Sequence, residues 1–326
     1  MNKLSCNTKK PNTPQLHQQM NPLRCNTKKP NTPPLHQQMN PLRCNSNTKK
    51  PNTPPLHQQM NPLRCNSNTK TPKTPPRALC EFYFDTSSPW TYLAFSRIQQ
   101  IAKRTGCELM LKPFLVGAVF NINNQALYTA RDKMFTPPSA ATPTNPAMQL
   151  PKNIWMEQDL RHWSDFLGLN IKSMKERYQS KRRNGKPGHP ISSVHMLRGA
   201  LVAQVEEGDD AMVRYATASF EAYWVELLDV SEKEVLHGIW NKAKLKTPWP
   251  VFWTRMKDAD IKQALRTNTQ EVIDRGGFGS PSVYISRPNK EKGFQEFFTW
   301  GNDRMELIEA HMLKAKGLPW RFQSRL

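Results

Sequence analysis

The chain has 326 residues and a net charge of +21, from 47 Lys and Arg against 26 Asp and Glu. Residues 1–77 hold 13 of the basic residues and none of the acidic ones, so residues 78–326 carry 34 basic and 26 acidic side chains. This moderate excess is more typical of a soluble domain, or of one that binds small anions, than of a nucleic-acid groove. No specific nucleic-acid partner is expected, although non-specific binding through the basic tail stays open. The longest apolar run, 109–120, is too short to cross a bilayer, so no membrane association is expected either.

Residues 1–77 form a repeat that we expect to be disordered. The segment Leu-His-Gln-Gln-Met-Asn-Pro-Leu-Arg-Cys occurs three times and ends at Cys25, Cys44 and Cys65. Each copy offers few apolar side chains, and prolines interrupt any helix, so too little area can be buried to offset the chain entropy. Each Cys stands alone rather than in the close pairs of zinc sites, so no metal site is predicted.

Residues 78–326 hold every aromatic side chain and predict alternating strands and helices. The helix over 89–104 shows an apolar stripe at helical spacing, with a proline in its first turn and Gly106 after its end. Ser231 and Glu234 predict a capping box at the start of a later helix. In chain order, the pattern predicts a strand over 81–85, a helix over 89–104, a strand over 108–116, a loop over 121–150, helices around 156–167, 191–206, 210–228, 231–243 and 258–274, strands over 282–286 and 294–300, and a helix over 305–315.

This order of elements predicts a thioredoxin-like α/β fold with an inserted α-helical domain. A βαβ unit comes first, a block of helices follows, and a ββα unit ends the pattern. We expect residues 78–120 and 258–320 to form the thioredoxin-like domain. Residues 121–257 are expected to form the inserted loop and helical domain.

The cysteines do not lie where a redox site of this fold would need them. Ser88 and Thr91 occupy the two positions at which redox relatives carry C-x-x-C, so no disulfide can form there. Dithiol–disulfide exchange at this site is therefore excluded. Cys80 and Cys107 come at the starts of two predicted strands and are interpreted as buried structural thiols.

Ser88 stands at the start of the first predicted helix. There the helix dipole and the unpaired N–H groups favour an anion, and a hydroxyl can donate a hydrogen bond to a thiolate. A positive helix end also lowers the pKa of a thiol from its ordinary value near ~8.5. Ser88 is thus a candidate for stabilising the thiolate of a bound thiol. The alternative is a plain N-cap, because Ser-Pro is a common helix opening.

Three motifs together resemble one family. They are Phe-Tyr-Phe-Asp-x-x-Ser-Pro-x-x-Tyr-Leu-Ala from Phe82, Gly-Phe-Gly-Ser-Pro-Ser from Gly277, and Trp-Gly-Asn-Asp-Arg from Trp300. In this order and spacing the chain resembles the kappa-class glutathione transferases and the 2-hydroxychromene-2-carboxylate isomerases. Both belong to the DsbA-like branch of the thioredoxin fold. The resemblance covers about residues 80–316.

The resemblance implies that glutathione supplies the thiol and that Ser88 activates it. Pro281 matches the cis-proline of the fold. The backbone of Ser280 would then pair with the cysteinyl part of glutathione like an added strand. The family usually has an aliphatic residue at the position of Ser280, but a backbone contact tolerates the change.

Other positions match the family's contacts with the rest of glutathione. Asn302 and Asp303 match the residues that hold its γ-glutamyl end, although both side chains could also cap the last helix. Lys152 matches a lysine that meets glutathione, and its alternative is a solvated surface charge. Asn145 matches a nearby asparagine if a gap is allowed.

The resemblance implies an enzyme that adds the glutathione thiolate to a small electrophilic substrate. Release of the adduct would be the conjugation of a kappa-class glutathione transferase, a detoxification reaction. Expulsion of glutathione after bond rotation would be the cis–trans isomerisation of the alternative family, and the motifs do not separate the two. A non-catalytic module that binds glutathione or a peptide is the alternative from another class. A homodimer is expected.

The last three residues, Ser324-Arg325-Leu326, are a close variant of the Ser-Lys-Leu peroxisomal address. We therefore expect a peroxisomal protein. Because kappa-class relatives are known in peroxisomes and mitochondria, the mitochondrion is one alternative location, and the cytoplasm is the other.

Overall fold

The computed structural model describes residues 78–126, 151–287 and 295–320. The repeat tail 1–77, predicted to be disordered, and the tripeptide Ser324-Arg325-Leu326 lie outside the described residues. Within the described ranges, no helix is both long enough and apolar enough to cross a membrane.

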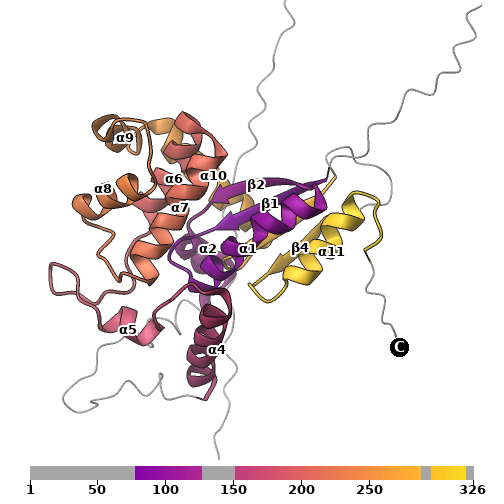
Figure 1. The fold of residues 1–326 in the computed structure, drawn as a ribbon, viewed down its shortest axis with the longest axis horizontal. Coiled ribbons are helices and arrows are strands. Elements are labelled where there is room, and N and C mark those ends of the chain that lie inside the picture. Colours follow the sequence, from indigo (N-terminus) through magenta and orange to yellow (C-terminus); the bar gives the residue numbers. More distant parts are fainter. Residues whose placement is uncertain (1–77, 127–150, 288–294, 321–326) are drawn as a thin grey trace, which may run out of the picture. The chain divides into compact units, whose positions relative to one another are not determined.

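Among the described residues, four strands form a mixed sheet at the centre of the fold (Figure 1). They are β1 (Leu79–Phe84), β2 (Glu108–Pro113), β3 (Ser282–Ser286) and β4 (Phe297–Trp300), in the order β2-β1-β3-β4. β2 is parallel to β1, whereas β3 is antiparallel to β1 and β4 is antiparallel to β3. The βαβ and ββα units thus join along β1 and β3, which confirms the predicted thioredoxin-like fold.

Helices cover both faces of this sheet. α1 (Pro89–Thr105) and α11 (Met305–Ala315) pack side by side (Figure 1) and share a core with Phe82 and Phe84 of β1. On the other face, Tyr83 of β1 packs in a second core with residues of α2 (Val116–Asn123) and α10 (Ala259–Asp274). Because successive side chains of a strand point to opposite faces, β1 supplies both cores.

A run of helices separates α2 from α10. They are α4 (Pro151–Leu167), α5 (Met174–Gln179), α6 (Val194–Glu207), α7 (Asp209–Trp224), α8 (Lys233–Lys242) and α9 (Trp249–Arg255). α6 and α7 pack so closely that a Cβ on Gly199 would come within 2.3 Å of the Tyr215 hydroxyl oxygen. α6 also contacts β2 and α7 contacts α1, which attaches these helices to the β2 edge of the sheet. The predicted domain boundaries stay a prediction.

Some predicted boundaries differ from the structure. The second strand ends at Pro113 rather than at 116, because α2 begins at Val116, whose N–H donates to a carboxylate oxygen of Asp85 at 2.9 Å. α2 therefore also occupies the start of the predicted loop over 121–150. α7 ends at Trp224 rather than at 228, and the short helices α5 and α9 were not predicted.

The predicted capping box at Ser231 and Glu234 is wrong. The N-cap of α8 is Glu232, which makes no capping hydrogen bond through its side chain. The Ser231 hydroxyl instead donates to Asp229 Oδ1 at 2.5 Å. A local loop bond of this kind competes with helix capping for the same hydroxyl.

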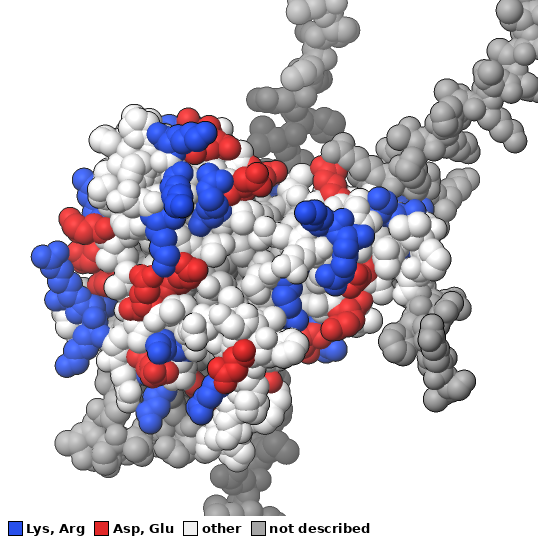
Figure 2. Space-filling model, viewed as in Figure 1, with Lys and Arg blue, Asp and Glu red and all other residues white. Residues whose placement is uncertain are grey.

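Charged side chains of both signs lie next to each other on the face shown in Figure 2. Among the described residues, Arg255 pairs with the carboxylates of Glu206, Asp258 and Asp260 at 2.7–3.0 Å. Such paired charges are typical of a solvated surface and differ from the one-sign surface that tracks a phosphate backbone. Within the described part of the chain, no cluster of three metal-ligating side chains occurs.

Candidate active site

The turn between β1 and α1 is built around the buried carboxylate of Asp85. Its Oδ1 accepts hydrogen bonds from the backbone N–H and the hydroxyl of Ser87, both at 2.9 Å, and its Oδ2 accepts from Val116 N–H. Burial raises the pKa of Asp85, and these hydrogen bonds oppose the rise. Because one side chain ties the end of β1 to α2, the residues that open α1 are held in a fixed geometry.

Ser88 is the N-cap of α1, as its alternative reading predicted. Its Oγ accepts a hydrogen bond from Thr91 N–H at 3.3 Å and donates to the Ser280 carbonyl oxygen at 3.2 Å. The first turn of α1 contains no acidic side chain, so nothing in that turn offsets the positive end of the helix dipole. This half-buried hydroxyl can therefore cap α1 and also lie close to the thiolate of a bound thiol.

Ser280 and Pro281 lie against the opening of α1. The peptide bond between them is cis, which confirms the prediction. The Ser280 side chain, whose role was not predicted, accepts a hydrogen bond from Asp85 N–H at 3.0 Å, and its Oγ lies 2.7 Å from Thr91 Oγ1. The one signal in the sequence for this contact was that Ser280 stands at a position where the resembling family usually has an aliphatic residue.

Asn302 and Asp303 lie just before α11, but neither caps it, because the N-cap is Arg304. Asn302 is buried, and its side-chain and backbone oxygens both accept hydrogen bonds from Arg97 of α1, at 3.1 and 2.5 Å. The Asp303 side chain is 56% exposed. Asn302 therefore joins α11 to α1, whereas the carboxylate of Asp303 is accessible to a ligand.

α4 brings a second carboxylate to Asp303. The pKa of Asp159 is raised by burial and by the negative charge of Asp303. Arg97 also stacks on Trp163 of α4, with its guanidinium carbon 4.7 Å from the ring centroid. Asp159 was not identified from the sequence, because no pattern around an aspartate in a helix shows that it lies near a residue 144 positions away in the chain.

The remaining two predicted contacts are those of Lys152 and Asn145. Lys152 is exposed in the first turn of α4. Seven residues separate it from Asp159, which is about two helical turns or roughly 10 Å along one face of the helix. Asn145 lies outside the described residues. The contacts predicted for both side chains stay predictions.

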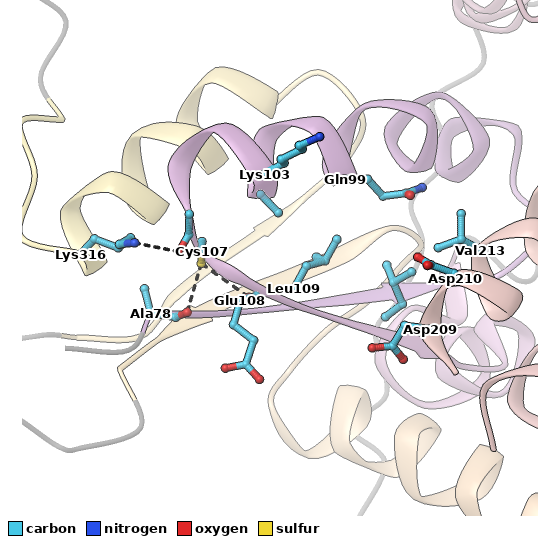
Figure 3. A pocket seen from close by; sticks show the side chains of 13 residues that line it. Ala78, Gln99, Lys103, Cys107, Glu108, Leu109, Asp209, Asp210, Val213 and Lys316 are labelled. Atoms are coloured by element: carbon cyan, nitrogen blue, oxygen red, sulfur yellow. Dashed lines mark hydrogen bonds between the residues drawn. The ribbon is translucent and has the colours of Figure 1, made fainter. Parts of the chain in front are cut away.

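A cavity of about 690 Å³ lies at the other end of α1 (Figure 3), and Ser88 is not among the residues that line it. Lys103, Asp210 and Cys107 are among its lining residues. The Cys107 thiol donates to the Ala78 carbonyl at 3.3 Å, and burial raises its pKa to about 11. The thiol is therefore protonated at neutral pH, in agreement with the predicted structural role.

The fold and the turn together define a class of protein. Redox members of the thioredoxin fold use a pair of cysteines where this chain has Ser88 and Thr91, so the chain is a thioredoxin-fold protein without that pair. The family model of the DsbA-like thioredoxin domain matches residues 80–313, and the chain belongs to this family.

Named relatives match about three quarters of the chain. Glutathione S-transferase kappa 1 of Caenorhabditis elegans is 24% identical over 245 residues, which cover 74% of this chain and 93% of the relative. A 2-hydroxychromene-2-carboxylate isomerase of Sphingobium xenophagum is 24% identical over 234 residues, which cover 72% and 97%. A solved structure of a 2-hydroxychromene-2-carboxylate isomerase matches with a TM-score of 0.50 at 19% identity and covers 72% of this chain and 95% of that chain. The last match shows a shared fold, and both named relatives are enzymes.

Proposed function

We propose that the protein is a glutathione-dependent enzyme in which the Ser88 hydroxyl stabilises the thiolate of bound glutathione. The observation that carries the proposal is the position of this hydroxyl. It lies at the positive end of α1 and within hydrogen-bond distance of the Ser280 carbonyl, the group expected to pair with the ligand backbone. The relatedness to a kappa glutathione transferase and to an isomerase supports it.

The chemistry of the surrounding side chains fits the parts of glutathione. The carboxylates of Asp303 and Asp159 suit the ammonium group of the γ-glutamyl end, and the buried Asn302 holds the loop that carries Asp303. Lys152 is expected to meet the ligand from α4, and the contact predicted for Asn145 is part of the same proposal. The positive end of the α1 dipole favours a sulfur anion beside Ser88, although Pro89 has no N–H and the Thr91 N–H already donates to Ser88 Oγ.

Bound glutathione supplies a thiolate nucleophile for a small electrophilic substrate. If the product keeps the carbon–sulfur bond, the reaction is a conjugation, as in the transferase relatives. If that bond breaks again after rotation, the reaction is an isomerisation, as in the isomerase relatives, which match this chain over 97% of their length in one case. We place conjugation first and isomerisation second.

The decisive experiment titrates the thiol of bound glutathione by the ultraviolet absorbance of its thiolate. We expect wild-type protein to lower the thiol pKa below its ordinary value and Ser88→Ala to raise it again by about one unit, because a charge-assisted hydrogen bond is lost. Ser96→Ala is the matched control, since the Ser96 hydroxyl donates to Leu93 O within α1. An equal thiol pKa in wild-type protein and Ser88→Ala would refute the role of Ser88.

A panel of electrophiles then separates the reactions. Adduct formation supports the transferase, and a change of double-bond geometry without net consumption of glutathione supports the isomerase. Glutathione binding with no turnover across the panel would instead favour the non-catalytic binding module.

A further inference from the structure

We propose that the Ser280 carbonyl selects the thiols that this site can activate, because it holds the Ser88 hydroxyl proton until a peptide N–H of the ligand takes its place. The inference rests on the proposed function and adds a specificity-determining group to it. It predicts that the site activates thiols carried on a peptide backbone and discriminates against simple thiols.

The first observation concerns the single proton of the Ser88 hydroxyl. A hydroxyl can donate only one hydrogen bond, although it can accept two. In this structure the Ser88 Oγ donates to the Ser280 carbonyl at 3.2 Å and accepts from Thr91 N–H at 3.3 Å. The same proton cannot be given to a thiolate at the same time. Stabilising a thiolate therefore requires the hydroxyl to turn away from the carbonyl.

The second observation is that the Ser280 carbonyl cannot follow this movement. Residue Ser280 is only 7% exposed. Its side-chain Oγ accepts a hydrogen bond from Asp85 N–H at 3.0 Å and lies 2.7 Å from Thr91 Oγ1. These two contacts attach Ser280 to both the end of β1 and the first turn of α1. The position of the carbonyl is therefore set by the fold.

Leaving a buried carbonyl without a hydrogen-bond donor costs about as much free energy as forming a new hydrogen bond gains. If the Ser88 hydroxyl turns to the sulfur and no other donor reaches the Ser280 carbonyl, the carbonyl loses its hydrogen bond. This loss offsets much of the free energy gained by the new hydrogen bond to the sulfur. A ligand N–H that reaches the carbonyl removes this penalty. The peptide backbone of the ligand and its sulfur are thus coupled through one hydroxyl proton.

The test compares glutathione with an analogue in which an ester oxygen replaces the cysteinyl N–H. This change removes the proposed donor and keeps the thiol, both carboxylates and the ammonium group. Both ligands are titrated at saturating concentration by thiolate absorbance. We expect wild-type protein to lower the thiol pKa of the ester analogue by about one unit less than that of glutathione, a tenfold difference in the ratio of thiolate to thiol.

Two variants show whether Ser88 transmits the effect. In Ser88→Ala the thiol pKa values of the two bound ligands should become equal, because no hydroxyl proton remains to be redirected. In Ser96→Ala, which removes a hydroxyl from the same helix, the difference should persist.

The outcomes separate this inference from the proposed function. If the thiol pKa of bound glutathione equals that of free glutathione, the proposed function fails. If glutathione and the ester analogue show the same lowered thiol pKa on wild-type protein, the proposed function stands and the role of the Ser280 carbonyl is overturned. A difference that persists undiminished in Ser88→Ala would also overturn it, because the N–H would then act without Ser88.

Discussion

The two ends of α1 carry opposite chemistry. At the N-terminal end, the hydroxyls of Ser88, Thr91 and Ser280 meet at the positive end of the helix dipole. At the C-terminal end lies the buried thiol of Cys107, and burial together with the nearby Cys107 raises the pKa of Cys80 well above its ordinary value. Burial in an apolar environment keeps a thiol protonated, whereas a helix N-terminus favours the thiolate.

The two ends of α1 therefore differ in whether a thiol can react there as a thiolate. The two cysteines of the described region lie in the environment that suppresses the thiolate, and the environment that favours a thiolate contains only hydroxyls. Neither cysteine of the described region can therefore supply a thiolate at the N-terminal end, whereas a bound thiol ligand could. Substitutions at one end of α1 at a time test whether each end has the chemistry described.

The largest effect is expected from Asp85→Ala at the N-terminal end. The variant leaves the N–H groups of Ser87 and Val116 without their acceptor in a buried turn. We expect the free energy of unfolding to fall by about 3 kcal/mol, as measured by urea denaturation. Asp165→Ala, at an exposed position of α4, is the control and should change the stability by less than about 0.5 kcal/mol. A similarly small loss in Asp85→Ala would show that the turn does not depend on this carboxylate.

Ser88→Cys tests the comparison directly by placing a protein thiol at the favourable end. We expect the introduced thiol to have a pKa below about 7.5, because the helix N-terminus stabilises its thiolate. The pKa of Cys107 at the other end is about 11. Alkylation rates as a function of pH, resolved by peptide mass spectrometry, would report each thiol separately. An introduced thiol with a pKa at or above about 8.5 would contradict the proposed electrostatics of this end.

The smallest effect is expected from Gly106→Ala at the C-terminal end. Gly106 has a φ of 63°, and an added Cβ would lie 2.8 Å from Lys316 Nζ. We expect a loss of about 1 kcal/mol in the free energy of unfolding, because an L-residue is strained in the left-handed region. Gly117→Ala is the matched control, since nothing lies within 4 Å of its added Cβ and its backbone is helical.

The same Gly106→Ala variant also tests whether the two ends are independent. The thiol pKa of bound glutathione should be unchanged in it, because no contact of Ser88 involves the C-terminal end of α1. A shift of that pKa would mean that the two ends are coupled through the helix.

Local patterns were sufficient for most of the thioredoxin-like half. The helix over 89–104 and the strand over 282–286 were predicted to within one residue, because an apolar stripe and Gly106 mark the first and an x-Pro turn marks the second. α5 and α9 were not predicted, since helices of six or seven residues are too short to show a 3.6-residue period. Competition between Asp229 and the helix for Ser231 was likewise invisible in the spacing.

The amino-acid sequence alone shows that hydroxyls replace cysteines at Ser88 and Thr91, which excludes a protein disulfide there. The contacts of those hydroxyls depend on the tertiary structure. Ser280 is 189 residues from Thr91 and 192 from Ser88, and no local pattern reports contacts across such separations. Chain packing determines which acceptor the Ser88 proton meets, because both the helix start and the Ser280 carbonyl are positioned by neighbouring strands of one sheet.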